Sequence, residues 1–293
     1  MKEDHNNHQE AQAARWDYRF NQLICIVVFV FSGLIQSLNA QCLPHTTLFK
    51  SGEYIKYDIY YKWGLLTPKA GEAELNINQA TYENSPAWHY RIRINTAGIA
   101  ETFYKVRDTI DNYYSLGKPL LLYSSKRTNE GGYYQIENIT FSYKEKNASA
   151  HVFRRSASSV KIDTMMYAQE CLYDILGTTV HLRGLDVENL QQGQEFPLQV
   201  AMGRSLINVS YRYEGQQIVE RGNVKYSTRL FYVDIYDEAF TTSKESAEIW
   251  LGNDDNQIPV KIRAKLRIGA MEAYYNTSSG LRYPLDSRIV LKK

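Results

Sequence analysis

Acidic side chains suited to acid–base chemistry occur throughout this sequence, but they form no recognisable motif. A glycoside hydrolase needs two carboxylates that flank the scissile bond. Four carboxylates in or beside predicted strands are candidates for such a pair, although a structural role at a turn or strand edge is favoured for each: Asp108, Asp111, Asp234 and Asp237. The sequence contains no CxxC pair, HExxH, GxSxG, phosphate loop or dinucleotide fingerprint. We therefore expect a protein without catalytic activity, with glycan hydrolysis in the cell envelope as the alternative.

Residues that bind metal ions are also dispersed. The four histidines beyond residue 40 show no ligand spacing: His45, His89, His151 and His181. Asp254 and Asp255 resemble a calcium loop, but the spacing of the helix–loop–helix calcium motif is absent and a hairpin turn explains them better. We expect no metal and no cofactor. His181 is expected at the surface, near a helix C-terminus, where a cation interacts favourably with the helix dipole.

Four residues carry charged or aromatic side chains that a binding site could use. Arg107 and Asp108 are neighbours in a predicted strand, so they point to opposite faces and one of them faces inward, where it needs a partner. Arg204 stands alone at a strand junction, and Trp63 ends an aromatic-rich strand. We predict that Trp63, Arg107, Asp108 and Arg204 line a ligand cavity or its rim. The competing interpretation is that the charged residues form structural ion pairs.

The first forty residues are typical of a secretory signal peptide. A polar stretch with basic residues precedes an apolar run over residues 23–34, and Ala40 provides the small residue that signal peptidase prefers. The run is shorter than the roughly 17–25 residues of a spanning helix, which favours cleavage after Ala40 over a stable transmembrane anchor. We therefore expect a periplasmic or otherwise exported protein.

Two cysteines remain after this cleavage, because Cys25 lies in the apolar run. Cys42 and Cys171 would then share an oxidising compartment, which favours a disulfide between them. In the chain-entropy model such a long loop closure contributes about 4 kcal/mol. Two unpaired thiols are the alternative. Lipidation of Cys42 is disfavoured, since Gln41 stands where a lipoprotein signal needs a small residue.

Hydrophobic alternation predicts a mainly β protein. Over residues 53–63, apolar and polar side chains alternate with the period of a strand, and after a turn the alternation resumes over 72–78. Turn signals then separate short alternating runs at intervals of eight to twelve residues. This rhythm predicts an antiparallel, strongly curved sheet, either a half-barrel or a sandwich.

One segment departs from this pattern. Apolar residues recur at helical spacing over 168–183, and Gly184 follows as a C-terminal cap, which predicts one principal α-helix that begins from Asp163 or Thr164. We expect a single β-rich domain over 41–293. It could comprise two related β halves, about 49–163 and 195–293, joined through the helix.

The net charge and the aromatic content indicate which classes of binding partner to expect. The formal net charge is +2 and no run of basic residues occurs, so nucleic acid is not expected. The 24 tyrosines favour packing inside and across strands, with an aromatic surface for sugar or lipid as the alternative. We predict a binding or carrier module for a lipid, another amphiphile or a glycan. A structural factor in envelope assembly, in contact with other envelope proteins, is a further alternative.

Several short motifs, taken in order, resemble the domain-of-unknown-function family 3108. They are Phe49, Gly52, Glu53, Tyr57, the Trp63 region and residues 70–75; residues 107–109; Cys171, Tyr173, Asp174 and Leu176; and residues 258–262 with Gly269. The resemblance implies a β-rich secreted protein of Gram-negative bacteria with no established activity, so it supplies no catalytic residue. The leader ending in Asn39, Ala40, Gln41 and Cys42 looks like those of the Bacteroidetes. A distant similarity to half-barrel lipoprotein carriers is an analogy of fold.

Overall fold

The computed structural model describes residues 49–116, 120–144, 147–168, 171–236 and 243–289. All of them belong to one compact unit, Ala40–Lys293. The expected signal peptide and its cleavage site, Cys42 and Asp237 lie outside the described residues. Within these ranges no helix is long and apolar enough to cross a membrane.

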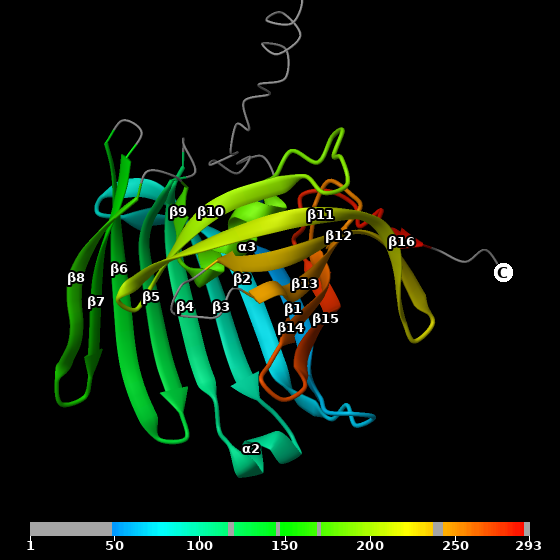
Figure 1. The fold of residues 1–293 in the computed structure, drawn as a ribbon, viewed down its shortest axis with the longest axis horizontal. Helices are drawn as coiled ribbons and strands as arrows, with labels where there is room; N and C mark the ends of the chain where they lie inside the picture. Colours follow the sequence, from blue (N-terminus) through cyan, green and yellow to red (C-terminus); the bar gives the residue numbers. More distant parts are fainter. Residues whose placement is uncertain (1–48, 117–119, 145–146, 169–170, 237–242, 290–293) are drawn as a thin grey trace, which may run out of the picture. The chain divides into compact units, whose positions relative to one another are not determined.

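The strands of the described ranges form one sheet (Figure 1), in the order β8-β7-β6-β5-β4-β3-β2-β1-β15-β14-β13-β12-β11-β10-β9, with β16 paired to β12. Neighbours are antiparallel except β9 and β10, which are parallel. The first meander comprises β1 (Glu53–Lys62), β2 (Lys69–Tyr82), β3 (Ser85–Thr96), β4 (Arg107–Ser115), β5 (Leu121–Glu130), β6 (Tyr133–Lys144), β7 (Asn147–Ser156) and β8 (Val160–Ala168). The remaining strands are β9 (Leu172–Tyr173), β10 (Glu195–Met202), β11 (Ser205–Arg221), β12 (Val224–Tyr236), β13 (Ser243–Gly252), β14 (Pro259–Lys265), β15 (Ala270–Ser279) and β16 (Arg288–Ile289).

The sheet is strongly curved and nearly closed, which confirms the predicted fold class as a half-barrel. Strand β1 pairs with β2 on one side and with β15 on the other, and so joins the two meanders. In Figure 1, β10, β11 and β12 cross in front of the wall formed by β2–β5. The turn between β10 and β11 reaches β8, where the Arg204 guanidinium donates a hydrogen bond to the Lys161 carbonyl oxygen.

One glycine shows how closely the strands approach at the junction of the meanders. Gly269 has φ +74°, and a Cβ atom there would lie 2.2 Å from the Lys62 carbonyl oxygen. Any larger residue would push the β14–β15 turn away from β1. The close approach lets the Tyr61 hydroxyl donate a hydrogen bond to the Ile268 carbonyl oxygen, at 3.0 Å.

Helix α3 (Ile175–Arg183) is shorter than the predicted helix over 168–183. Strand β8 continues to Ala168 and β9 precedes the helix, so the sequence interpretation of the N-terminal half was wrong. Asp174 is the actual N-cap, because its carboxylate accepts the Gly177 backbone N–H at 2.7 Å. A second, short helix, α2 (Ile99–Phe103), connects β3 to β4.

Helix α3 lies between the wall of β2–β5 and the crossing strands (Figure 1), with contacts to β4, β9 and β10. It is therefore buried on most sides. His181 is only 1% exposed and lies between the rings of Tyr173 and Tyr211, so its expected surface position was wrong. The sequence pattern could not show this, because the half-barrel encloses this end of the helix.

Buried polar contacts anchor both ends of α3. At its start, the Asp174 carboxylate also accepts hydrogen bonds from the Asn112 amide at 2.7 Å and the Ser124 hydroxyl at 2.6 Å. At its end, the fully buried Arg183 guanidinium pairs with the Glu53 carboxylate at 2.7 Å. These contacts attach the helix to β4, β5 and β1 and fill this end of the half-barrel, which we call the helix end.

The opposite end of the strands carries five connections, which we call the rim: residues 63–68, 97–106, 131–132, 157–159 and 266–269. Figure 1 shows α2 and these turns together at the lower edge. Strands β1, β3, β5, β7 and β14 run toward the rim, and β2, β4, β6, β8 and β15 start from it. Every one of these strands thus extends from the filled end to the rim.

Candidate functional site

The inner face of the sheet changes character between the helix end and the rim. Seven apolar side chains toward the rim pack against the core but remain half-buried: Ile59, Ile92, Ile94, Val233, Ile235, Ile262 and Ala273. They belong to β1, β3, β12, β14 and β15, which lie within the continuous stretch of sheet from β3 to β12. This apolar part therefore keeps surface that a bound molecule could cover.

The neighbouring strands β4–β7 present charged groups on the same inner face. Strand alternation places Asp108 on the face of buried Ile110, and Glu137 on the face of buried Ile139. Asp108 is 7% exposed and accepts the Asn129 backbone N–H at 2.9 Å. The Glu137 carboxylate accepts a hydrogen bond from the Arg154 guanidinium of β7, at 2.7 Å. Lys126 and Glu130 of β5 share this face.

Two carboxyl groups in this charged part interact directly. Burial and then the hydrogen-bonded Asp108 carboxyl raise the pKa of Glu130 above its usual range. The Tyr104 hydroxyl lies 3.4 Å from Glu130 Oε2. The two carboxyl groups are therefore neighbours at the border of the rim, and ionisation of Glu130 is disfavoured there.

The four residues predicted to bind a ligand do not converge. Asp108 alone faces inward among them, as one member of the Arg107–Asp108 pair was expected to do. Arg107 lies on the outer face, where it pairs with Glu101 of α2 and donates to the Thr96 carbonyl oxygen. Arg204 is exposed in the β10–β11 turn, and Trp63 is 60% exposed on the rim. Their roles in ligand binding remain predictions.

The carboxylates considered for hydrolysis lie apart or already have partners. Asp111 lies on the outer face, with His89 at 2.6 Å, Arg91 at 2.5 Å and Arg127 also paired to it. Burial alone would raise its pKa, but the hydrogen bonds from His89 and Arg91 outweigh burial and hold the pKa of Asp111 below its usual value. Asp234 pairs with Arg212 at 3.0 Å and accepts the Glu245 backbone N–H. Asp237 lies outside the described residues.

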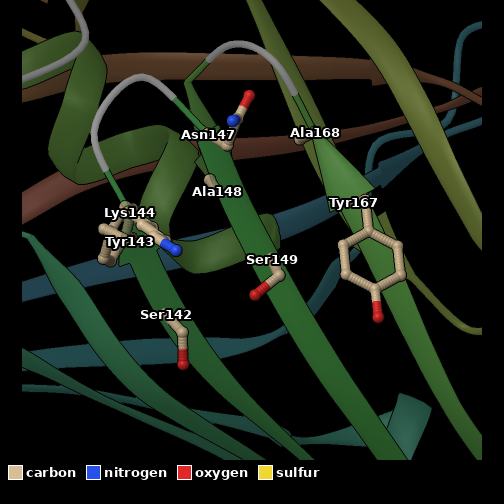
Figure 2. A pocket seen from close by; sticks show the side chains of 8 residues that line it. All are labelled: Ser142, Tyr143, Lys144, Asn147, Ala148, Ser149, Tyr167 and Ala168. Atoms are coloured by element: carbon tan, nitrogen blue, oxygen red, sulfur yellow. The ribbon is translucent and has the colours of Figure 1, made fainter.

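Two pockets lie toward the helix end. One, of about 510 Å³, is shown in Figure 2 at the ends of β6, β7 and β8, lined by Ser142, Tyr143, Lys144, Asn147, Ala148, Ser149, Tyr167 and Ala168. The other, of about 590 Å³, is lined by Leu185, Asp186, Val187, Glu188, Arg229, Asn253, Asp254, Asp255, Gln257 and Tyr283. Neither contains any of the four predicted ligand residues.

The loop that resembles a calcium site lies in the second pocket. The Asp254 carboxylate accepts backbone N–H groups from Asn256, Gln257 and Ser287, at 3.0–3.1 Å. The Asp254 carboxylate therefore stabilises the turn, as the hairpin interpretation predicted. In the described ranges, no three histidine, cysteine or acidic side chains are grouped to hold a metal ion.

Cys171 and many tyrosines are buried in the described part of the fold. Cys171 is 5% exposed next to β9, and Cys42 lies outside the described residues, so the disulfide between them remains a prediction. Many tyrosines are buried in the core, such as Tyr57 and Tyr90. Others stack on the outer face, where the rings of Tyr82 and Tyr123 are 5.5 Å apart.

Sequence reasoning missed four inner-face charges of β5–β7: Lys126, Glu130, Glu137 and Arg154. Counting every second position from the apolar residues Ile139 and Val152 would have assigned Glu137 and Arg154 to the core face. Their mutual contact follows from the β6–β7 register, in which they are directly opposite.

Comparison with known proteins places the chain in a family. No curated protein matches it. Among solved structures, it resembles the crystal structure of a beta-barrel-like protein of domain of unknown function DUF1849 from Brucella abortus, with a TM-score of 0.53, 9% identity, and coverage of 78% of this chain and 97% of that one. At this identity the likeness concerns the fold alone. The profile of the protein family of unknown function DUF3108 matches residues 56–275, most of the chain. The chain therefore belongs to the DUF3108 family, as its ordered motifs predicted.

Proposed function

We propose that this protein is a non-catalytic carrier that holds an amphiphile against the inner face of its half-barrel, between α3 and the rim. The observation that carries the proposal is the division of this face. Half-buried aliphatic side chains occupy the β1–β3 and β12–β15 part, and charged groups occupy the β4–β7 part beside it. A molecule with an apolar and a polar end is complementary to both parts.

The aliphatic part and the charged part of the inner face would contribute differently to binding. Covering apolar surface contributes about 25 cal/mol per Å², so an acyl chain over the aliphatic part would supply most of the affinity. Charged groups such as Lys126 and the Glu137–Arg154 pair would orient the head group. A glycan fits less well, because flat aromatic side chains suit sugar rings and the half-buried inner face near the rim is aliphatic.

The hydrolase alternative finds weaker support. A glycosidase needs carboxyl groups about 5–10 Å apart, with room for the sugar or a water molecule between them. Asp108 and Glu130 already have partners within the fold, since Asp108 accepts the Asn129 backbone N–H and the Tyr104 hydroxyl lies 3.4 Å from Glu130. A purely structural protein would be expected to have a filled interior. Ile92 and Ile94 are only half-buried on the inner face, which favours the carrier function over a structural role.

The proposal is tested by native mass spectrometry of protein purified from a Gram-negative host, followed by extraction of bound molecules and titration of the delipidated protein with a fluorescent fatty acid. We expect a bound amphiphile and saturable binding of the probe at one molecule per chain. Ile94→Asn places a polar group on the inner face and should weaken probe binding about tenfold, because it removes apolar contact area.

The matched control is Arg93→Asn, the neighbouring residue on the same strand. Arg93 is exposed on the outer face, so this variant should bind the probe as the wild type does. Equal losses in both variants, or no saturable binding in the wild type, would reject the carrier function. Turnover on a panel of envelope glycans that Glu130→Gln abolishes would transfer the assignment to a hydrolase.

A further inference from the structure

The rim exposes most of the large apolar side chains that the described residues leave open to solvent. Those in or directly beside its connections are Trp63, Leu65, Leu66, Ile99, Phe103, Tyr104, Tyr133, Tyr134, Val160, Leu266 and Ile268. Phe103 is 83% exposed and Leu65 is completely exposed. Single exposed apolar residues are ordinary, but a cluster at one end of a soluble protein marks an interaction surface.

These side chains come from separate segments that the sheet brings together. The connection after β1 approaches the β14–β15 turn, where the Tyr61 hydroxyl is bonded to the Ile268 carbonyl oxygen. Helix α2 contacts β2, and the Gly131 backbone N–H donates to the Lys105 carbonyl oxygen at 2.9 Å. The apolar groups therefore share one edge of the half-barrel, as Figure 1 shows for their connections.

Basic side chains surround this apolar edge. Exposed lysines and arginines lie in or near three of its five connections: Lys105, Arg155, Lys161, Lys265 and Arg267. Glu101 nearby is paired with Arg107, and Lys265 is paired with Glu245, so the remaining four basic side chains supply the positive charge. The rim thus presents apolar side chains inside a positive border.

We propose that the rim docks onto a bilayer surface that contains anionic lipids. The aliphatic and phenylalanine side chains would enter the boundary between head groups and acyl chains, and Trp63 with the tyrosines would lie at head-group level. Lysines and arginines would contact lipid phosphates. Charge complementarity selects this partner over a second copy of the chain, because two rims facing each other would juxtapose their positive borders.

Docking in this orientation turns the open part of the inner face toward the membrane. An amphiphile held there would then meet the bilayer without crossing bulk water. The docking surface goes beyond the proposed carrier function and does not depend on it, because the rim side chains and the half-buried inner-face residues are different sets.

Vesicle flotation tests the proposal with the full exported chain. We expect the protein to float with vesicles of phosphatidylethanolamine and phosphatidylglycerol, and to remain in solution with vesicles of phosphatidylcholine alone. High salt should weaken the binding, because it screens the border charges. Leu65→Ser/Phe103→Ser should lower the partition coefficient about tenfold or more through lost apolar insertion. Lys105→Glu/Arg267→Glu should lower it through charge reversal.

The matched control is Tyr167→Ser/Ile218→Ser, which removes two exposed apolar side chains away from the rim, on β8 and β11. It should float as the wild type does, and all variants should keep the wild-type unfolding midpoint. Absence of flotation in the wild type, or equal loss in this control, would overturn the proposal. A wild-type dimer in sedimentation that Leu65→Ser/Phe103→Ser dissociates would assign the rim to a second copy instead. Rim variants that lose flotation but keep fatty-acid binding separate this proposal from the carrier function.

Discussion

The helix end and the rim are built from the same strands but from opposite kinds of residue. At the helix end, buried polar groups anchor α3, as Arg183 does with Glu53 and Asp174 does with Asn112. At the rim, large apolar groups are exposed and few of them contact the core. The contrast indicates that stability is concentrated at one end and that the other is left available for binding.

Strand β1 shows this change along a single inner-facing row. Ile55 and Tyr57 are buried at 0% and 6% exposure, whereas Ile59, nearer the rim, is half-buried. The sequence alternation is uniform along this row, so it cannot reveal the gradient. The buried part of the strand lies near the end of α3, where Arg183 pairs with Glu53 at the start of β1.

The largest effect should follow from removing the cation of the buried pair. Arg183→Met leaves the Glu53 carboxylate buried without a cation, which costs about 3–5 kcal/mol of unfolding free energy. Urea unfolding followed by near-ultraviolet circular dichroism measures the loss. The double variant Glu53→Gln/Arg183→Met should recover part of it, because no charge then remains buried. An unchanged midpoint in Arg183→Met would remove the pair from the account of the helix end.

Equivalent leucine truncations should separate the two ends. Leu182→Ala in α3 deletes a fully buried side chain and should lower the unfolding free energy by about 2–5 kcal/mol. Leu66→Ala on the rim, where the side chain is 63% exposed, should change it by less than about 0.5 kcal/mol. Thermal and urea unfolding of both variants give the comparison. Similar losses would mean that the rim is part of the packed core.

The helix cap should have a smaller effect. Asp174→Ala removes the acceptor for the Gly177 N–H, the Asn112 amide and the Ser124 hydroxyl, and leaving such buried donors unpaired costs about 1–3 kcal/mol. Burial raises the pKa of the Asp174 carboxyl despite these hydrogen bonds, so replacing its charge is not itself expected to destabilise. Asp174→Asn keeps one acceptor oxygen and should lose less than Asp174→Ala in the same unfolding assay.

The smallest effect concerns the carboxyl pair at the border of the rim. The folded pKa of Glu130 is raised, so its ionisation is disfavoured in the folded protein, and stability is lost as pH rises from the unfolded pKa through the folded one. Glu130→Gln lacks this loss and should unfold at a higher urea concentration than the wild type at neutral pH. The difference should vanish below the unfolded pKa, about pH 4. A pH-independent difference would point to a packing effect of the amide.

Alternation and turn residues were sufficient to locate most strands, because each inner-facing row is apolar at the helix end. The start of α3 was misplaced because Asp163 and Asp174 are both acceptable caps by residue type. Only burial of the carboxylate against Asn112 and Ser124 selects Asp174. Alternation along β4 predicts that either Arg107 or Asp108 faces inward, but it does not say which. The partners of Asp108 come from β5, and no local sequence pattern predicts how β5 is aligned with β4.

Hydrogen–deuterium exchange with and without phosphatidylglycerol-containing vesicles tests the division between the two ends most directly, because it reports both ends in one experiment. We predict slower exchange on vesicle binding in residues 63–68, 97–106 and 266–269 of the rim. No change is expected in α3 or in residues 253–258 of the helix end. Protection at the helix end, or equal protection at both ends, would contradict the account.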